Sequence, residues 1–375
     1  MRILQVASGM PRWAGTEKYV IDISAELLRM GHEVAIGCQR NSDIEAQATK
    51  QGIPIVPLIM KSTQDWKQFP IFFRAIRGRF DVVNTHDFRD YIVPAVAARL
   101  AATPAVIMTR HLPHPFNSGF SAYLCSRVFY DRIIAVSEAV RDILTNSGVA
   151  EERVRVVING IDSPAGLAAN GAEFRAGLSL PAGAMLVAAA GRIEDKKGFD
   201  ILIRAIGIAR NQGVDVHAAI AGRGEDRAHL ESLRDGLGLT SFIQFLGFRS
   251  DVLNVLAAAD MVTVPSKWEE PLGYGVLEAM SCGTPTIASR TGGIPEIAID
   301  GTAILVPPGD IDELARAIIS LASNPAMRAE LSQKGRARAM NFTVAACATG
   351  VERVYQEVLT ARTNGQKSAL EGRRV

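Results

Sequence analysis

The chain has 375 residues, 48% of them hydrophobic, which is too long for one small domain and sufficient for two hydrophobic cores. Its 41 basic and 39 acidic residues leave a formal net charge of +2, so the composition does not indicate a nucleic-acid-binding protein. The four cysteines are scattered without C-x-x-C spacing, which argues against a zinc site or a disulfide framework and favours a reducing cytoplasm.

The first half of the chain alternates apolar runs with segments of helical periodicity. Strands are expected at residues 2–8, 32–38, 80–86, 105–111, 132–137 and 154–160. Between the first two strands, Val20, Ile23 and Leu27 recur at helical spacing, and Gly31 ends that helix. A strand–helix–strand unit of this kind favours a parallel sheet.

The alternation is interrupted at residues 163–183, which are rich in Gly, Ala, Ser and Pro, and we expect the hinge between two domains there. It resumes with strands at residues 185–191, 216–222, 242–247, 260–266 and 285–289. A later helix begins with the capping pair Asp310 and Glu313. The last helix is expected over residues 343–361, followed by a disordered tail at 362–375.

These elements predict an α/β fold of two Rossmann-like, doubly wound domains that face a central cleft, where a ligand would bind. The N-terminal domain is predicted to span residues 1–163 and the second domain residues 164–342. The sequence has no run of about 18 apolar residues, so no membrane-spanning helix is expected. The apolar run within the first ten residues is too short and too soon interrupted to be a signal peptide.

The string EPLGYGVLEAM begins at Glu270, directly after a predicted strand, and enters a helix near Gly273. Carboxyl ends of strands are where open α/β sheets bind ligands. Gly273 and Gly275 would let an anion approach the backbone N–H groups at the helix N-terminus, where the helix dipole favours negative charge. Glu278 lies about one turn inside the helix, so two carboxylates suited to sugar hydroxyls flank a phosphate cradle.

A second string, GRIEDKKG, follows the strand predicted at 185–191 and contains Arg192 and Lys197. Together the two strings resemble motifs of the retaining glycosyltransferases of family 4, which have the GT-B fold. The E-x7-E motif of that family is matched by Glu270 and Glu278, and its G-R-x4-K-G string by GRIEDKKG. The resemblance implies the GT-B fold for this chain.

Three further strings extend the resemblance over about residues 1–360. TGGIPE, at 291–296, also fits the family pattern. VINGID, at 157–162, is similar to the family's boundary motif, with Ile158 in place of the usual proline. AGTEKY is similar to the first-loop motif, with Ala14 in place of the usual first glycine.

The resemblance implies a role for each matched residue of the second domain. Glu278 would bind the nucleotide ribose, and Glu270 would contact the donor sugar. Arg192 and Lys197 would neutralise the diphosphate. Backbone groups completing the cradle would come from Gly273, Tyr274, Gly275 and Val276.

In the N-terminal domain the resemblance implies that Gly15 approaches the phosphates. His111 resembles a family histidine near the donor sugar, with His86 and His114 as competing candidates. The terminal helix at 343–361 would return to this domain.

A departing nucleoside diphosphate gains negative charge, which Arg192, Lys197 and a helix N-terminus would stabilise. Because no clear N-terminal carboxylate stands out as a nucleophile, we expect front-face attack in which the diphosphate takes the acceptor's proton.

Neither a cofactor nor a divalent metal is expected. The one Asp-x-Asp string, Asp310-Ile311-Asp312, is explained as helix capping.

Three other functions are alternatives to a glycosyltransferase. A nucleotide-sugar epimerase and a non-catalytic nucleotide-sugar-binding protein would share the architecture. A nicotinamide dehydrogenase fits poorly, because Gly9 and Gly15 in the first loop do not form a G-x-G-x-x-G string.

The donor is expected to be a UDP-sugar, with GDP- and ADP-sugars as alternatives. TRHLPHP resembles a subgroup of bacterial envelope and lipopolysaccharide glycosyltransferases, which implies a glycan or lipid-linked acceptor.

Residues 65–80 mix aromatic with basic side chains, as an interfacial segment or an ordinary two-faced helix would. We therefore expect a cytoplasmic protein with peripheral contact at the inner membrane face. Asp87, after the strand at 80–86, is a position that could face the acceptor.

Overall fold

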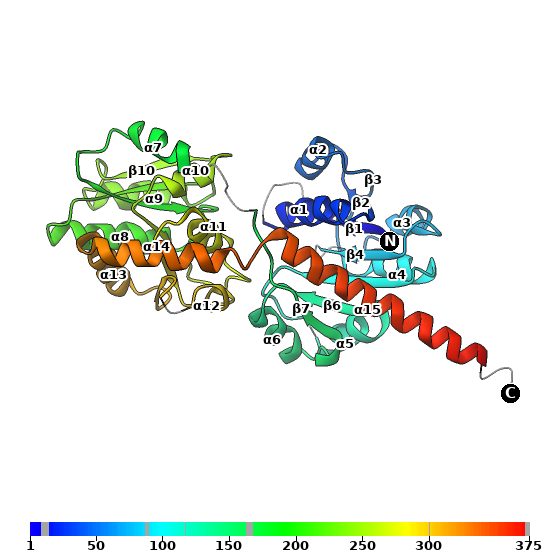
Figure 1. The fold of residues 1–375 in the computed structure, drawn as a ribbon. Coiled ribbons are helices and arrows are strands. Elements are labelled where there is room, and N and C mark those ends of the chain that lie inside the picture. Colours follow the sequence, from blue (N-terminus) through cyan, green and yellow to red (C-terminus); the bar gives the residue numbers. More distant parts are fainter. Residues whose placement is uncertain (9–14, 87–89, 117, 163–167, 300, 372–375) are drawn as a thin grey trace. The chain divides into compact units, whose positions relative to one another are not determined.

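The computed structural model of the chain describes residues 1–8, 15–86, 90–116, 118–162, 168–299 and 301–371 (Figure 1). The chain divides into two compact units. Unit 1 comprises Met1–Gly160 together with the C-terminal segment from Val344, and unit 2 comprises Ile161–Thr343. Each unit is built on one parallel β-sheet packed with helices, which confirms the predicted α/β fold class.

The sheet of unit 1 has seven parallel strands in the order β3-β2-β1-β4-β5-β6-β7. They are β1 (Arg2–Val6), β2 (Glu33–Cys38), β3 (Ile55–Pro57), β4 (Val82–Thr85), β5 (Ala105–Arg110), β6 (Arg132–Ala135) and β7 (Val154–Val156). The chain order therefore reverses between β1 and β4. At such a switch point the loops after the two central strands lie next to each other at the carboxyl edge.

Helices cover both faces of this sheet. They are α1 (Gly15–Arg29), α2 (Asp43–Lys50), α3 (Phe69–Ile76), α4 (Val93–Leu100), α5 (Gly119–Tyr123), α6 (Glu138–Asn146) and α15 (Val344–Glu371). Further helical segments are the π-helix η3 (Leu124–Phe129) and the 3₁₀ turns η1 (Trp66–Gln68) and η4 (Glu151–Arg153). Val20 of α1 and Val351 of α15 pack in one core cluster with Ile36. Phe72 of α3 packs with Val83 in another. Strands that are buried on both faces need the nearly continuous apolar runs seen in the sequence.

Helix α15 follows unit 2 in the sequence but packs in unit 1. Its Val351, Val358 and Tyr355 are buried, and its Glu357 accepts hydrogen bonds from Arg132 and Arg155. The helix extends to Glu371, so the structure differs from the predicted tail at 362–375. These residues contain no proline and many good helix formers, which allows the helix to continue.

The sheet of unit 2 has six parallel strands in the order β10-β9-β8-β11-β12-β13, so its chain order reverses between β8 and β11. The strands are β8 (Met185–Ala190), β9 (Val216–Ala221), β10 (Ile243–Gly247), β11 (Met261–Val264), β12 (Thr286–Ser289) and β13 (Ile304–Val306). The helices are α7 (Ala168–Ala176), α8 (Phe199–Asn211), α9 (Arg227–Gly236), α10 (Val252–Ala257), α11 (Tyr274–Cys282), α12 (Ile294–Ile297), α13 (Ile311–Ser323) and α14 (Pro325–Ala339), with the turn η5 (Asp195–Lys197).

The predicted strands are confirmed, each within the range expected from the sequence. The segment 163–183 differs from the prediction, because α7 occupies much of it. Residues 163–167 lie outside the described residues. Asp310 caps α13 by accepting a hydrogen bond from the backbone N–H of Glu313 (2.9 Å), as predicted.

Candidate functional site

The loops that follow β8 and β11 are joined at the carboxyl edge of the unit 2 sheet. β8 is followed by Arg192 and η5, and β11 by the segment that leads into α11. The backbone N–H of Lys267 in the second loop donates to the carbonyl of Lys196 in the first (2.9 Å). The two motif strings of the sequence therefore meet at the switch point of this sheet, where open α/β sheets bind ligands.

Lys197 and Glu270 form an ion pair between these two loops. Lys197 Nζ lies 2.6 Å from Glu270 Oε1, and the hydroxyl of Ser266 donates to the same oxygen at 2.5 Å. The side chains of Lys197 and Glu270 are only 20% and 8% exposed. A buried charge is costly unless it is paired and hydrogen-bonded, so each member of the pair depends on the other.

Cations gather around Trp268 in the loop after β11. The Nζ atoms of Lys196 and Lys197 lie 4.7 and 5.7 Å from the centroid of its ring, within the range of cation–π contacts. Lys267 on the same loop pairs with Asp195 of η5 at 2.5 Å. Three lysines therefore lie around this loop, and Lys267 is paired with a carboxylate.

Arg192 lies in the loop after β8 but is engaged by a neighbour. Its Nη1 lies 2.7 Å from Glu194 Oε1, and its side chain is 55% exposed. Lys196 pairs with the other oxygen of Glu194 at 2.8 Å. Exposed ion pairs contribute about 0–1 kcal/mol, so exchange of Glu194 for a bound anion would cost little.

The N-terminus of α11 is not capped by a side chain. Its N-cap residue, Gly273, has a left-handed backbone (φ 95°) and no side-chain cap. A Cβ at Gly273 would lie 2.7 Å from Ile294 Cγ1, so packing against α12 also requires glycine there. Tyr274, Gly275 and Val276 form the first turn, as predicted. The missing side-chain cap and the helix dipole make this terminus suitable for an anion.

Glu278 lies about one turn into α11 and is half-buried. It follows the residues of the open N-terminus on the same helix, while Glu270 precedes them in the loop. The two carboxylates therefore lie on either side of the helix start along the chain.

Three residues of this edge were missed by the sequence analysis, namely Ser266, Lys267 and Trp268. A signal was present, because these polar and aromatic residues directly follow the apolar run of β11. Residues in that position lie at the ligand-binding edge of a parallel sheet.

The remaining candidates belong to unit 1. His111 follows β5, is 7% exposed, and lies with its Nε2 3.1 Å from His86 Nδ1. Burial lowers the pKa of His111 to about 3, with a smaller contribution from the charge of Arg110. Burial also holds the pKa of His86 well below its usual value. His114 is exposed, and its carbonyl accepts a hydrogen bond from Arg110.

Gly15 is the first residue of α1 and is exposed. The predicted first-loop residues Gly9 and Ala14 lie outside the described residues, as does Asp87. The structure thus gathers Arg192, Lys197, Glu270 and the start of α11 in unit 2, whereas Gly15 and His111 belong to unit 1.

No group of three or more His, Cys, Asp or Glu side chains within the described ranges could hold a metal ion. In the same ranges, no helix is long and apolar enough to cross a membrane. Cys38, Cys125, Cys282 and Cys347 are free thiols.

Comparison with protein families covers most of the chain. Residues 13–163 match the family described as "Glycosyltransferase Family 4", and residues 171–338 match "Glycosyl transferases group 1". The chain belongs to glycosyltransferase family 4. As a family 4 glycosyltransferase it falls among the transferases of class EC 2.4, which confirms the resemblance carried by its motifs.

Two curated relatives and one solved structure illustrate what this family 4 glycosyltransferase is similar to. It is 34% identical to the D-inositol 3-phosphate glycosyltransferase of Saccharomonospora viridis, over 62% of this chain but only 56% of that relative. It is 37% identical to the lipopolysaccharide core biosynthesis glycosyltransferase LpsE of Rhizobium meliloti, over 43% of this chain and 46% of the relative. The chain therefore matches about half the length of each.

The crystal structure of Anabaena HepE in complex with UDP and glucose superposes with a TM-score of 0.83 at 24% identity, covering 95% of this chain and 100% of HepE. At this identity the similarity shows the fold alone, and it confirms the predicted GT-B fold.

Gly198→Ala should push apart the loops that carry Lys197 and Glu270. Gly198 has φ 68°, and an added Cβ would lie 2.0 Å from the carbonyl oxygen of Pro265. Gly213 is a matched control, because it has φ 83° but nothing within 4 Å of an added Cβ. Gly213→Ala should cost only the left-handed strain, about 1–2 kcal/mol.

Urea unfolding should show that Gly198→Ala lowers the free energy of unfolding by about 1–3 kcal/mol more than Gly213→Ala, because the clash adds to the strain. Equal losses in the two variants would contradict the importance of this loop contact.

Proposed function

We propose that this family 4 glycosyltransferase transfers a sugar from a nucleotide-sugar donor to a glycan or lipid-linked acceptor with retention of the anomeric configuration. The process would be cell-envelope polysaccharide or lipopolysaccharide synthesis. One observation carries the proposal, namely the buried pair between Lys197 and Glu270 of the loop that leads into α11, whose N-terminus has no side-chain cap. It offers a cation and a helix terminus to a diphosphate and a carboxylate to sugar hydroxyls.

The diphosphate would be held mainly by unit 2. The ammonium of Lys197 has three N–H donors and uses one on Glu270, so two remain for phosphate oxygens. Arg192 would exchange Glu194 for the diphosphate and can grip two oxygens at once. Backbone groups from Gly273 to Val276 would complete the cradle.

The two glutamates would recognise hydroxyl groups. Glu278 would accept hydrogen bonds from the ribose, and Glu270 from the donor sugar. Charge-assisted hydrogen bonds of this kind contribute about 1.5–3 kcal/mol each. The family resemblance assigns Gly15 to the phosphates and His111 to the donor sugar, and both assignments are part of the proposal.

The chemical step is proposed as front-face substitution. The acceptor oxygen attacks the anomeric carbon on the face from which the diphosphate leaves, and the bond between that carbon and the phosphate oxygen breaks. The departing oxygen takes the acceptor's proton.

Lys197, Arg192 and the α11 terminus would stabilise the charge that develops on the leaving group. This route requires neither a protein nucleophile nor a divalent metal.

The names of similar proteins support the choice of substrates. HepE is described in complex with UDP and glucose, which supports a UDP-sugar over a GDP- or ADP-sugar. LpsE is named for lipopolysaccharide core biosynthesis, which supports an envelope glycan as acceptor. The relative from Saccharomonospora viridis, named for D-inositol 3-phosphate, adds a phosphorylated small acceptor as the alternative.

The large apolar side chains that unit 1 exposes all lie on one helical layer in the described part of the chain. They are Trp66, Ile71, Leu100, Phe120, Tyr123 and Val128. These residues belong to η1, α3, α4, α5 and η3, and α4 packs against both α3 and η3. Exposed Lys67 and Arg74 add positive charge beside them. Apolar anchors mixed with cations suit an anionic membrane surface, which we propose as the source of a lipid-linked acceptor.

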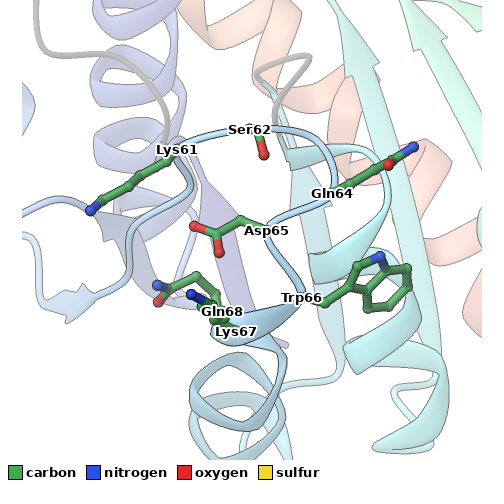
Figure 2. A pocket seen from close by; sticks show the side chains of 7 residues that line it. All are labelled: Lys61, Ser62, Gln64, Asp65, Trp66, Lys67 and Gln68. Atoms are coloured by element: carbon green, nitrogen blue, oxygen red, sulfur yellow. The ribbon is translucent and has the colours of Figure 1, made fainter.

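A hollow of about 510 Å³ also lies in this region, in the loop that leads into α3 (Figure 2). It is lined by Lys61, Ser62, Gln64, Asp65, Trp66, Lys67 and Gln68. Figure 2 shows the indole of Trp66 directed away from the side chains of Lys61 and Asp65. No ion pair joins the residues that line the hollow, so we do not assign the donor to it.

Incubation of the purified chain with UDP-, GDP- and ADP-sugars tests the function. The proposal predicts hydrolysis or transfer with a UDP-sugar, undiminished by EDTA, and a first-formed product that keeps the donor's anomeric configuration in NMR. An inverted product, or activity that returns only on adding Mg²⁺ or Mn²⁺, would contradict it. Isomerised donor without acceptor would indicate an epimerase, and binding without turnover a non-catalytic binding protein.

Sedimentation with vesicles of anionic phospholipid tests the membrane surface. The double variant Trp66→Ser, Ile71→Ser should bind about tenfold more weakly, because two exposed apolar side chains that would enter the membrane surface are lost. Binding by the unmodified chain should fall as salt is raised. The matched control Leu237→Ser, Phe248→Ser changes exposed apolar residues of unit 2 and should bind normally. Equal binding by all three proteins would refute the assignment.

A further inference from the structure

Four buried polar side chains of unit 1 form a hydrogen-bonded relay that ends at His111. Gln5 Nε2 on β1 donates to the hydroxyl of Tyr355 on α15 (3.3 Å), and Gln5 Oε1 lies 2.7 Å from His86 Nε2. His86 Nδ1 lies 3.1 Å from His111 Nε2. Gln5 and Tyr355 are 0% exposed and His86 2%. Because water does not reach these groups, each depends on its neighbour for a partner.

The direction of the hydrogen bonds along this relay sets where the imidazole protons lie. The amide oxygen of Gln5 can only accept, so His86 must carry its proton on Nε2. A neutral imidazole has a single proton, so His86 Nδ1 is an acceptor. It therefore receives the proton of His111 Nε2. This leaves His111 Nδ1 unprotonated.

The orientation of Gln5 is set by Tyr355. Its phenol oxygen accepts from Gln5 Nε2 and also from Asn84 Nδ2 at 2.8 Å. The phenol lies against the Nε2 end of the Gln5 amide, so the Oε1 end faces His86. The start of the relay is thus on α15, and the end is in the loop after β5.

The surroundings keep both imidazoles neutral. Burial lowers the pKa of His86 and that of His111 far below the physiological range. Arg110, which neighbours His111, opposes a second positive charge there. The ring of Tyr19 packs edge-on against His111 with centroids 4.6 Å apart and restricts its rotation. A single neutral form of His111 therefore persists at physiological pH.

His111 Nδ1 is the open end of the relay. No hydrogen-bond partner is present for it among the described residues. His111 Nδ1 is also not one of the fully buried side-chain atoms that lack a hydrogen-bond partner among the described residues. His111 is 7% exposed, so a ligand can reach the relay at this nitrogen.

We propose that Gln5, His86 and Tyr355 are positioning residues that hold His111 with its proton on Nε2 and present Nδ1 as a hydrogen-bond acceptor. An uncharged acceptor favours a hydroxyl group and disfavours a phosphate or carboxylate oxygen, which cannot donate. The chemical class recognised at this position is therefore a sugar or acceptor hydroxyl. This last step rests on the proposed transferase function, whereas the protonation of His111 does not.

NMR of the full chain with ¹⁵N-labelled histidine tests the relay without any activity assay. Protonated and unprotonated imidazole nitrogens resonate in separate regions, so the spectrum reports the tautomer directly. We expect one neutral tautomer for His111, protonated on Nε2. Tyr355→Phe removes the acceptor that orients Gln5, so His111 should become a mixture of both tautomers, and turnover should fall about three- to tenfold.

Tyr130→Phe is the matched control. Tyr130 is also a buried tyrosine of unit 1, but its hydroxyl bonds to Thr85 and to the carbonyl of Tyr91, outside the relay. The His111 signals in the spectrum of Tyr130→Phe should match those of the unmodified chain. Gln5→Met is a second way to break the relay if Tyr355→Phe folds poorly, and it should also give mixed tautomers.

A proton on Nδ1 of His111 in the unmodified chain would overturn the proposal, as would an unchanged tautomer in both Tyr355→Phe and Gln5→Met. The expected tautomer in a chain that shows no transferase activity would uphold the relay and count against the proposed function. Transferase activity in a chain whose His111 is protonated on Nδ1 would overturn the relay and support the proposed function.

Discussion

The candidate site of unit 2 depends on the ion pair between Lys197 and Glu270. The pair joins two loops that leave neighbouring strands, β8 and β11, where the chain order of the sheet reverses. Because both side chains are largely buried, the pair fixes an ammonium and a carboxylate at the carboxyl edge before a ligand arrives. Charge placed in advance in this way stabilises a transition state with little reorganisation at the moment of reaction.

In unit 1 a carboxylate also links the two strands at the switch point of the sheet, but the groups that donate to it are uncharged. Asp90, after β4, accepts from the backbone N–H of Ser8 (3.0 Å) and from its hydroxyl (2.5 Å), after β1. Gln5 on β1 and His86 after β4 form a second neutral link between the same strands. The buried ammonium of Lys197 in unit 2 suits a diphosphate, whereas the neutral imidazoles of unit 1 suit hydroxyl groups.

The sequence was sufficient for the strands, the fold class and the edge on which the motif residues lie, because a parallel sheet buried on both faces requires long apolar runs. It could not show that Arg192 pairs with Glu194, or that Lys197 shares its ammonium with Glu270, since such pairs depend on how loops pack. The link between Gln5 and Tyr355 joins the two ends of the chain and leaves no local pattern. The extent of α15 was missed because its polar composition resembles that of a tail.

Calorimetry of UDP binding to the ligand-free chain tests the central claim, that the edge carrying Lys197 and α11 binds the diphosphate and the ribose. Lys197→Ala and Glu278→Gln should each weaken binding by about tenfold to a hundredfold, the loss expected for one charge-assisted hydrogen bond. Lys196→Ala is the matched control, because Lys196 also contacts Trp268 but pairs with Glu194, and its affinity should change little. Thermal unfolding of each variant would confirm that the fold persists. Unchanged affinity in Lys197→Ala and Glu278→Gln, or an equal loss in Lys196→Ala, would contradict the account.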